Sequence, residues 1–121
     1  MSNAESVQAM LQNNTQYTIK YQSVTVEFGR YYNKNTTIAP NSTGQIFYAS
    51  AVTITSGCVG AVIYNFVDQH GNTQIVTLTY SDPFEGANSF TVAVPNGMTG
   101  SVPAPQGNQV LVTYTIGGSI P

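Results

Sequence analysis

The residues able to carry out acid–base or nucleophilic chemistry are few and lie far apart in the chain. The single histidine, His70, stands two positions after Asp68 in the segment Gln69-His70-Gly71-Asn72, whose composition is typical of a hairpin turn. A Ser-His-Asp system also needs a nucleophile held on a tight elbow, and the sequence contains no G-x-S-x-G motif. The sequence therefore predicts no catalytic residues and a protein that is not an enzyme.

Metal and thiol chemistry are not indicated either. The acidic residues are scattered without the spacing of a calcium loop, and no cluster of His and Cys has zinc-ligand spacing. We therefore expect no metal and no cofactor. Cys58 lies between Gly57 and Gly60 beside a predicted strand, where a buried, inert thiol is the usual finding. A reactive or dimer-forming thiol is the alternative.

Aromatic residues beside loops are the more informative group. Tyr31, Tyr32 and Phe84 fall next to segments rich in turn residues, whereas most other aromatic residues alternate along predicted strands as core residues do. A ring on a loop is suited either to the face of a sugar or to the interface of a bilayer. We interpret these three residues as candidates for membrane contact.

Composition excludes several classes of partner. The chain has 121 residues with three Lys or Arg, five Asp or Glu and a net charge of -2, so that charged residues make up 7% of it. Three cations cannot follow a phosphate backbone or anchor a polybasic segment, which excludes nucleic acid as a partner. A hydrophobic content of 41% indicates a folded chain, and its length fits one domain over residues 1–121.

The elements that must position these residues are predicted to be strands. Val7, Ala9 and Leu11 alternate with polar residues, and the turn-forming segment Asn13-Asn14-Thr15 predicts a hairpin to the next alternating segment, 17–21. A short helix over 5–11 is the alternative. A change of parity after residue 21 predicts a bulge near Gln22-Ser23.

Apolar and polar residues also alternate with a period of two in the rest of the sequence. Strands are predicted over 45–55, 61–68, 73–80, 90–94 and 110–116, a hairpin turn over 69–72, a strand end at Gly29, and loops over 31–44 and 95–108. Short strands at regular spacing without a long helix predict an all-β fold, an antiparallel β-sandwich or barrel.

Several segments together resemble the aegerolysin family of small β-sandwich cytolysins, and most closely the small component of bacterial binary insecticidal crystal toxins. The segments that carry the resemblance are Asn13-Asn14-Thr15, Gly29-Arg30-Tyr31, the run 78–88 and the closing run 107–116. The run 78–88 contains a corner formed by Asp82, Pro83, Gly86 and Asn88, which we expect to present Phe84. The chain has no Trp, and Ser56 precedes Gly57 where many fungal members carry an acidic residue, so the insecticidal branch fits better than the fungal one.

The resemblance implies an antiparallel β-sandwich of the aegerolysin or actinoporin-like type without enzyme activity. It implies a pore-forming insecticidal toxin component that binds a membrane lipid or midgut receptor, acts with a larger second toxin protein and forms homo-oligomers on membranes. The sequence shows no leader, so we expect the protein to be synthesised in the cytoplasm, where it can be stored as inclusions. We expect it to act on target-cell membranes after its release. A lectin-like carbohydrate-binding module without pore formation is the alternative, and a self-assembling structural protein is a third hypothesis.

Overall fold

A computed structural model describes residues 4–121, and within that range the chain forms ten strands and no helix. The strands are β1 (Ser6–Asn14), β2 (Ile19–Phe28), β3 (Arg30–Asn33), β4 (Thr37–Ile38), β5 (Ser42–Ser50), β6 (Cys58–Val67), β7 (Thr73–Asp82), β8 (Ser89–Ala93), β9 (Met98–Ser101) and β10 (Gln109–Gly118). The segment 5–11, for which a helix was the alternative, is therefore mostly strand.

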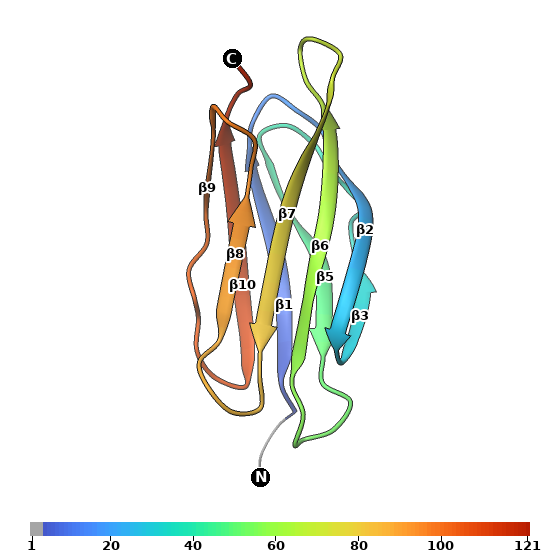
Figure 1. The fold of residues 1–121 in the computed structure, drawn as a ribbon, viewed down its shortest axis with the longest axis vertical. Helices are drawn as coiled ribbons and strands as arrows, with labels where there is room; N and C mark the ends of the chain where they lie inside the picture. The colour runs from blue at the N-terminus through green and yellow to red at the C-terminus, as the bar shows by residue number, and fades with distance from the viewer. Residues whose placement is uncertain (1–3) are drawn as a thin grey trace.

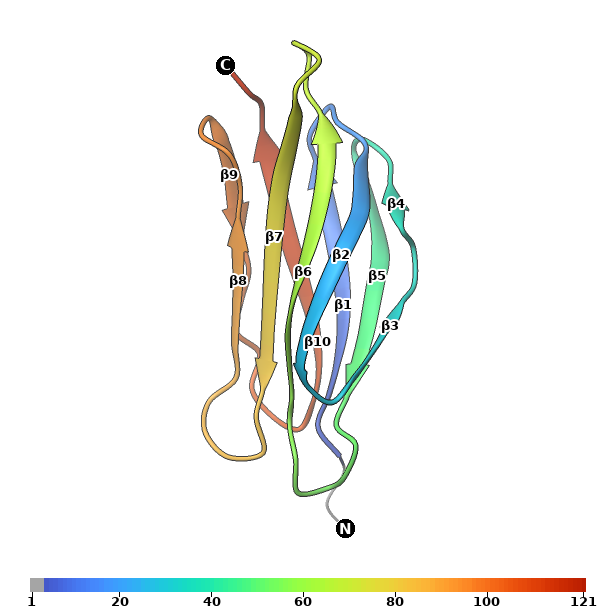
Figure 2. The ribbon, with the colours of Figure 1, turned by 45° about the vertical axis from the view of Figure 1, so that its right-hand side comes forward.

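The strands form two five-stranded sheets that pack face to face (Figures 1 and 2). Sheet A has the order β3-β5-β1-β10-β9, and sheet B has the order β4-β2-β6-β7-β8. The prediction of an antiparallel β-sandwich is confirmed, with one exception inside sheet A, where β1 pairs with β10 in parallel. Two parallel neighbours need a long connection, and here eight strands in both sheets lie between β1 and β10.

The predicted first hairpin is wrong, because β1 belongs to sheet A and β2 to sheet B. The residues between them carry the chain from sheet A to sheet B instead. Asn13 is fully buried, and its side-chain amide donates to the carbonyl oxygens of Tyr17 at 2.8 Å and Ala39 at 3.1 Å. The side-chain oxygen Oδ1 of Asn13 accepts from the Thr15 backbone N–H at 3.1 Å. These bonds supply polar partners that a hairpin ladder would otherwise supply, so the turn residues mark a crossing between sheets.

We expect Asn13→Ala to lower the free energy of unfolding by about 2 to 3 kcal/mol, since several buried backbone groups would lose their partner at once. The exposed neighbour Asn14 provides a matched control, and Asn14→Ala should change stability by less than about 0.5 kcal/mol. Urea denaturation followed by circular dichroism measures both values. Equal effects of the two substitutions would contradict the structural role given to Asn13.

Some of the other local predictions agree with the structure and some differ from it. The pairing of β2 with β6 shifts register between Tyr21 and Ser23, as the predicted bulge requires, and β2 ends at Phe28 just before Gly29. Residues 68–72 connect β6 to β7 as the predicted hairpin. The predicted strand over 45–55 is β5, which begins at Ser42 and ends at Ser50, so residues 51–55 lie in a loop. The two predicted loops also contain short strands, β3 and β4 in the first and β9 in the second.

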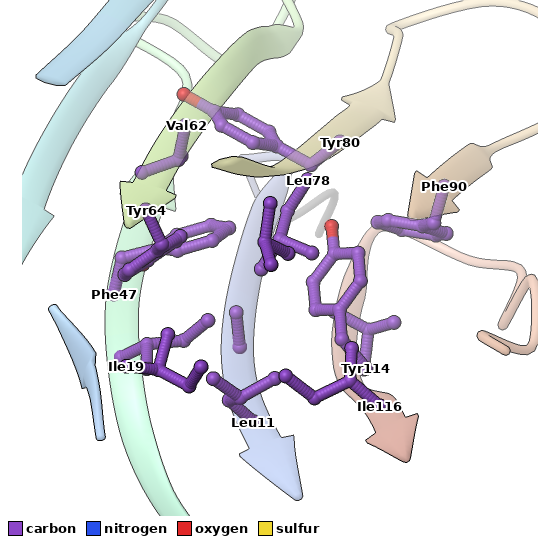
Figure 3. Packing of buried hydrophobic residues seen from close by; sticks show 14 of the residues in the cluster. Leu11, Ile19, Phe47, Val62, Tyr64, Leu78, Tyr80, Phe90, Tyr114 and Ile116 are labelled. Carbon is purple, nitrogen blue, oxygen red and sulfur yellow. The ribbon is translucent and has the colours of Figure 1, made fainter. Parts of the chain in front are cut away.

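The core between the sheets is rich in aromatic rings (Figure 3). Phe47 of sheet A contacts Tyr80 of sheet B with ring centroids 5.0 Å apart. The Tyr114 hydroxyl of sheet A donates to the Thr79 carbonyl of sheet B at 2.6 Å, and burial raises the pKa of Tyr114. This bond joins the sheets directly, so their relative position is set by polar contact as well as by packing.

Candidate functional site

Three connections lie side by side at one end of the sandwich, where the segment 102–108 before β10 also lies. They are the turn at Gly29 between β2 and β3, the loop 51–57 between β5 and β6, and the loop 83–88 between β7 and β8. In Figures 1 and 2 this end lies at the bottom, where the arrowheads of β2, β5 and β7 point. We call these connections, with the adjoining Phe28, the lower end.

Two glycines allow these connections to pack tightly. Gly29 has a φ of +87°, and a Cβ there would lie 2.5 Å from the Ser50 carbonyl oxygen, so the turn fits closely against the end of β5. A Cβ on Gly57 would lie 2.7 Å from the Pro83 Cα and 3.0 Å from the Phe84 nitrogen. The loop 51–57 therefore lies directly against the backbone that carries Phe84.

Large apolar side chains project into solvent from all three connections. The exposed fractions are 58% for Phe28, 57% for Val52, 58% for Ile54 and 47% for Phe84. A cleft of about 310 Å³ opens between Phe28 and Phe84, lined by these two residues and by Thr55, Ser56, Gly57, Val59 and Pro83. Val52 and Ile54 lie on the same loop as Thr55 but do not line the cleft. Scattered exposed apolar residues are ordinary on a protein surface, but two exposed rings that line one cleft, with two more apolar side chains on a loop of that cleft, indicate a contact site.

The charges near this end are few and mixed. Glu27 and Glu85 are exposed beside Phe28 and Phe84, and Arg30 is exposed just after Gly29. With one cation against two carboxylates, this end has no electrostatic attraction for an anionic surface. Contact there must depend on apolar burial.

The three aromatic residues predicted to contact membranes are not brought together. Phe84 lies at the lower end, and Tyr32 projects from the outer face of sheet A with 46% of its surface exposed. Tyr31 points inward, where its ring centroid is 5.3 Å from that of Phe47 and 6.5 Å from that of Tyr21. Burial raises the pKa of Tyr31. Whether these residues contact lipid stays a prediction.

The four residues of the predicted corner surround Phe84 in the structure. Asp82 ends β7 and is fully buried, Pro83 follows it, and Gly86 has a φ of +99°. Asn88 is also buried, and its side-chain amide donates to the carbonyl oxygens of Pro105 at 3.1 Å and Gly107 at 2.9 Å. The loop is thus tied at both ends, while Phe84 between them faces solvent.

A buried pair of carboxyl groups lies beneath this corner. Asp82 is 0% exposed and Glu5 is 3% exposed, and neither carboxyl oxygen of Asp82 has a hydrogen-bond partner of ordinary geometry among residues 4–121. Burial raises the pKa of Asp82 to about 8, and the nearby Glu5 carboxyl raises it as well. The Glu5 carbonyl oxygen accepts from the Ala51 N–H at 2.8 Å, which ties the pair to the loop 51–57.

The other residues considered for chemistry lie elsewhere. His70 is exposed in the turn between β6 and β7, at the opposite end from Phe84, and its backbone N–H donates to the Asp68 carboxylate at 2.8 Å. Hydrogen bonds, that from Gln74 foremost, lower the pKa of Asp68. Cys58 is buried, and desolvation raises the pKa of its thiol to about 12. Among residues 4–121, no three His, Cys, Asp or Glu side chains gather as a metal site would require.

Sequence reasoning missed Phe28, Val52 and Ile54. Val52 and Ile54 were included in a predicted strand because they continue its alternation. Ile46, at the same parity, is buried, so the alternation alone gives no signal that Val52 and Ile54 leave the sheet.

Comparison with known proteins supports the fold. The solved structures that share it include RahU in complex with a TRIS molecule, the lipid binding protein Nakanori, and IP-1A from Alcaligenes faecalis. RahU, an aegerolysin-family protein, is 17% identical with a TM-score of 0.70, and the match covers 97% of each chain. Nakanori is 10% identical with a TM-score of 0.75, covering 95% of this chain and 72% of its own. IP-1A is 13% identical with a TM-score of 0.69, covering 98% of this chain and 94% of its own.

These similarities confirm the expected aegerolysin-like β-sandwich as a fold. No protein-family model and no curated protein sequence matches the chain. Among residues 4–121 there is also no helix long and apolar enough to cross a membrane.

Proposed function

We propose that the protein binds the surface of lipid membranes through its lower end. The observation that carries this proposal is the pair of exposed rings Phe28 and Phe84, which line one cleft. Val52 and Ile54 are exposed on the loop 51–57, whose last residues line the same cleft. The three connections pack closely against the rest of the fold. Gly29 and Gly57 allow close backbone contact, and Asn88 ties the loop 83–88 by hydrogen bonds. A supported apolar end can enter the interfacial region of a bilayer without unfolding the sandwich.

The energetics favour shallow insertion. Full burial of a Phe, Ile or Val side chain stabilises by about 1.5 to 3 kcal/mol, so four partly exposed side chains together can hold a protein on a bilayer. The cost of approach is small because charged residues make up 7% of the chain and few ions must lose water. A fold shared with the lipid binding protein Nakanori supports the same interpretation.

Flotation of the protein with phosphatidylcholine vesicles on a density gradient tests this proposal. We expect a fraction of the protein to rise with the vesicles at low and at high salt, since apolar contact is not screened. Recovery of all of the folded protein at the bottom of the gradient, with plain vesicles and with total lipid from insect midgut membranes, would refute it.

We also propose that this binding serves a pore-forming insecticidal toxin component, made in the cytoplasm and acting after release. In this proposal it forms homo-oligomers on midgut membranes and works with a larger second toxin protein. The support is the sequence resemblance to the aegerolysin family together with the shared fold. Release of a trapped dye from midgut brush-border vesicles tests it, and vesicles that bind the protein but stay sealed, alone and with the partner, would contradict it.

A further inference from the structure

The outer face of sheet A carries a row of four side chains that no part of the proposed contact uses. Tyr32 of β3 pairs with Tyr48 of β5, Tyr48 pairs with Gln8 of β1, and Gln8 pairs with Leu111 of β10. Tyr32, Gln8 and Leu111 are exposed and Tyr48 is half-buried. We call these four residues the tyrosine row. Four adjacent strands make it about 14 Å long.

The two tyrosine rings offer neighbouring surfaces of similar orientation. Their centroids are 6.3 Å apart and their planes differ by 29°. Since both rings stand on the same face of the sheet, a flat ligand can contact them together. A tyrosine ring offers an apolar face and a polar tip, a combination suited to a ligand with both characters.

Amide side chains continue the row as a shallow groove. A hollow of about 370 Å³ is lined by Ser6, Gln8, Tyr48, Gln109, Val110 and Leu111. Gln8 and Gln109 are exposed, and each amide offers donors and an acceptor. The groove lining contains no charged side chain. Its chemistry therefore fits a neutral ligand rich in hydroxyl groups.

The distance from the tyrosine row to the lower end follows from the position of Tyr32 on β3. Tyr32 follows Arg30 by two residues on one strand face, and Arg30 follows the Gly29 turn next to Phe28. Two residues of a strand span about 7 Å. When Phe28 enters the interfacial region of a bilayer, the tyrosine row faces the layer of lipid headgroups.

We propose that the tyrosine row binds the sugar headgroup of a glycolipid. This inference rests on the proposed membrane contact and names the lipid class that it selects. The C–H face of a sugar ring lies against Tyr32 and Tyr48, and its hydroxyl groups exchange hydrogen bonds with Gln8 and Gln109. The cations Arg30 and Lys34 stand two residues before and two residues after Tyr32 at the edge of the sheet, and neither lines the groove. A second copy of the chain would meet amides rather than a continuous apolar surface.

The test compares phosphatidylcholine vesicles with and without glucosylceramide. Wild-type protein should bind the glycolipid vesicles roughly fivefold to tenfold more tightly. The double variant Tyr32→Ala/Tyr48→Ala and the single variant Gln8→Ala should lose that preference and keep the binding to plain vesicles. Tyr32→Phe/Tyr48→Phe retains both rings and should retain most of the preference, which separates loss of stacking from loss of fold.

A second measurement needs no membrane. Methyl glucoside titrated into the wild-type protein should shift the NMR signals of the Tyr32 and Tyr48 rings and leave those of the buried Tyr114 unchanged. It should also remove the preference for glycolipid vesicles when added in excess, without displacing the protein from plain ones.

Each contrary outcome has a distinct meaning. Equal binding of wild-type protein to both vesicle types, with no NMR shift, overturns the sugar site and leaves the membrane contact standing. A preference that survives the alanine variants overturns the assignment to the tyrosine row. A preference for phosphatidylserine vesicles that Arg30→Gln/Lys34→Gln abolishes identifies a phosphate headgroup instead. Absence of binding to every vesicle refutes the membrane contact, and the NMR titration then decides the sugar site alone.

Discussion

Replacing Phe28 and Phe84 together with Ser should weaken binding to phosphatidylcholine vesicles roughly 30- to 150-fold. Both rings are about half exposed at the lower end, at 58% and 47%. Removing two such rings from the bilayer interface costs about 2 to 3 kcal/mol of binding free energy. The fold should be retained, because neither ring belongs to the buried core. Vesicle flotation over a range of lipid concentrations measures the change.

The opposite end of the sandwich offers a matched control. Val67 is 61% exposed at the end of β6, next to the hairpin turn at residues 68–72. Val67→Ser removes exposed apolar surface far from Phe84 and should leave vesicle binding unchanged. If Val67→Ser weakens binding as much as the double variant does, the contact does not lie at the lower end.

Replacing Asp82 with Asn should make the protein more stable at alkaline pH. The Asp82 carboxyl is fully buried, and its pKa is raised from 3.8 to about 8, by burial first and by Glu5 second. Between these two pH values the unfolded chain has lost the proton while the folded chain still holds it. The free energy of unfolding of the wild type therefore falls as pH rises from about 4 to 8.

Asn is neutral at every pH, so Asp82→Asn should abolish this decline. The two proteins should have similar stability near pH 4, and the variant should be the more stable one at pH 9. Both should lose stability below about pH 4, where Asp68, whose pKa is lowered, takes up its proton. Thermal denaturation at intervals of pH measures the profiles.

Glu85 supplies the control for this experiment, because it lies on the same loop and is exposed. Glu85→Gln should leave the pH profile of the wild type unchanged. A wild-type profile that is flat between pH 5 and 9, or parallel profiles for wild type and Asp82→Asn, would show that the buried carboxyl pair does not carry the proton assigned to it.

The sequence predicts the strands well where one face is buried. Alternation at β6, β7 and β10, the bulge after Tyr21 and the hairpin at residues 68–72 all follow from side-chain periodicity and turn residues. The partner of each strand does not follow. Asn13 is typical of a turn in any setting, and its hydrogen bond to Ala39, a residue distant in sequence, accompanies a crossing to the other sheet that the local pattern does not specify.

Local sequence pattern also predicts only part of the candidate site. Phe84 stands out because turn residues surround it, whereas Val52 and Ile54 continue an alternating pattern that ends in the fold at Ser50. Their grouping with Phe28 arises from tertiary contact between separate connections, such as that of Gly57 with Pro83. Periodicity along one segment carries no information about such contacts.

A polarity-sensitive label attached at residue 84 tests the membrane contact most directly. Cys58 is buried with a raised pKa, so a Phe84→Cys variant can be labelled at the introduced thiol, and a His70→Cys variant provides the same label at the opposite end. On vesicles that contain nitroxide lipids, the label at residue 84 should shift its emission to the blue and be quenched, and the label at residue 70 should not. Quenching at residue 70 alone, or at neither residue while the protein floats with the vesicles, would contradict binding through the lower end.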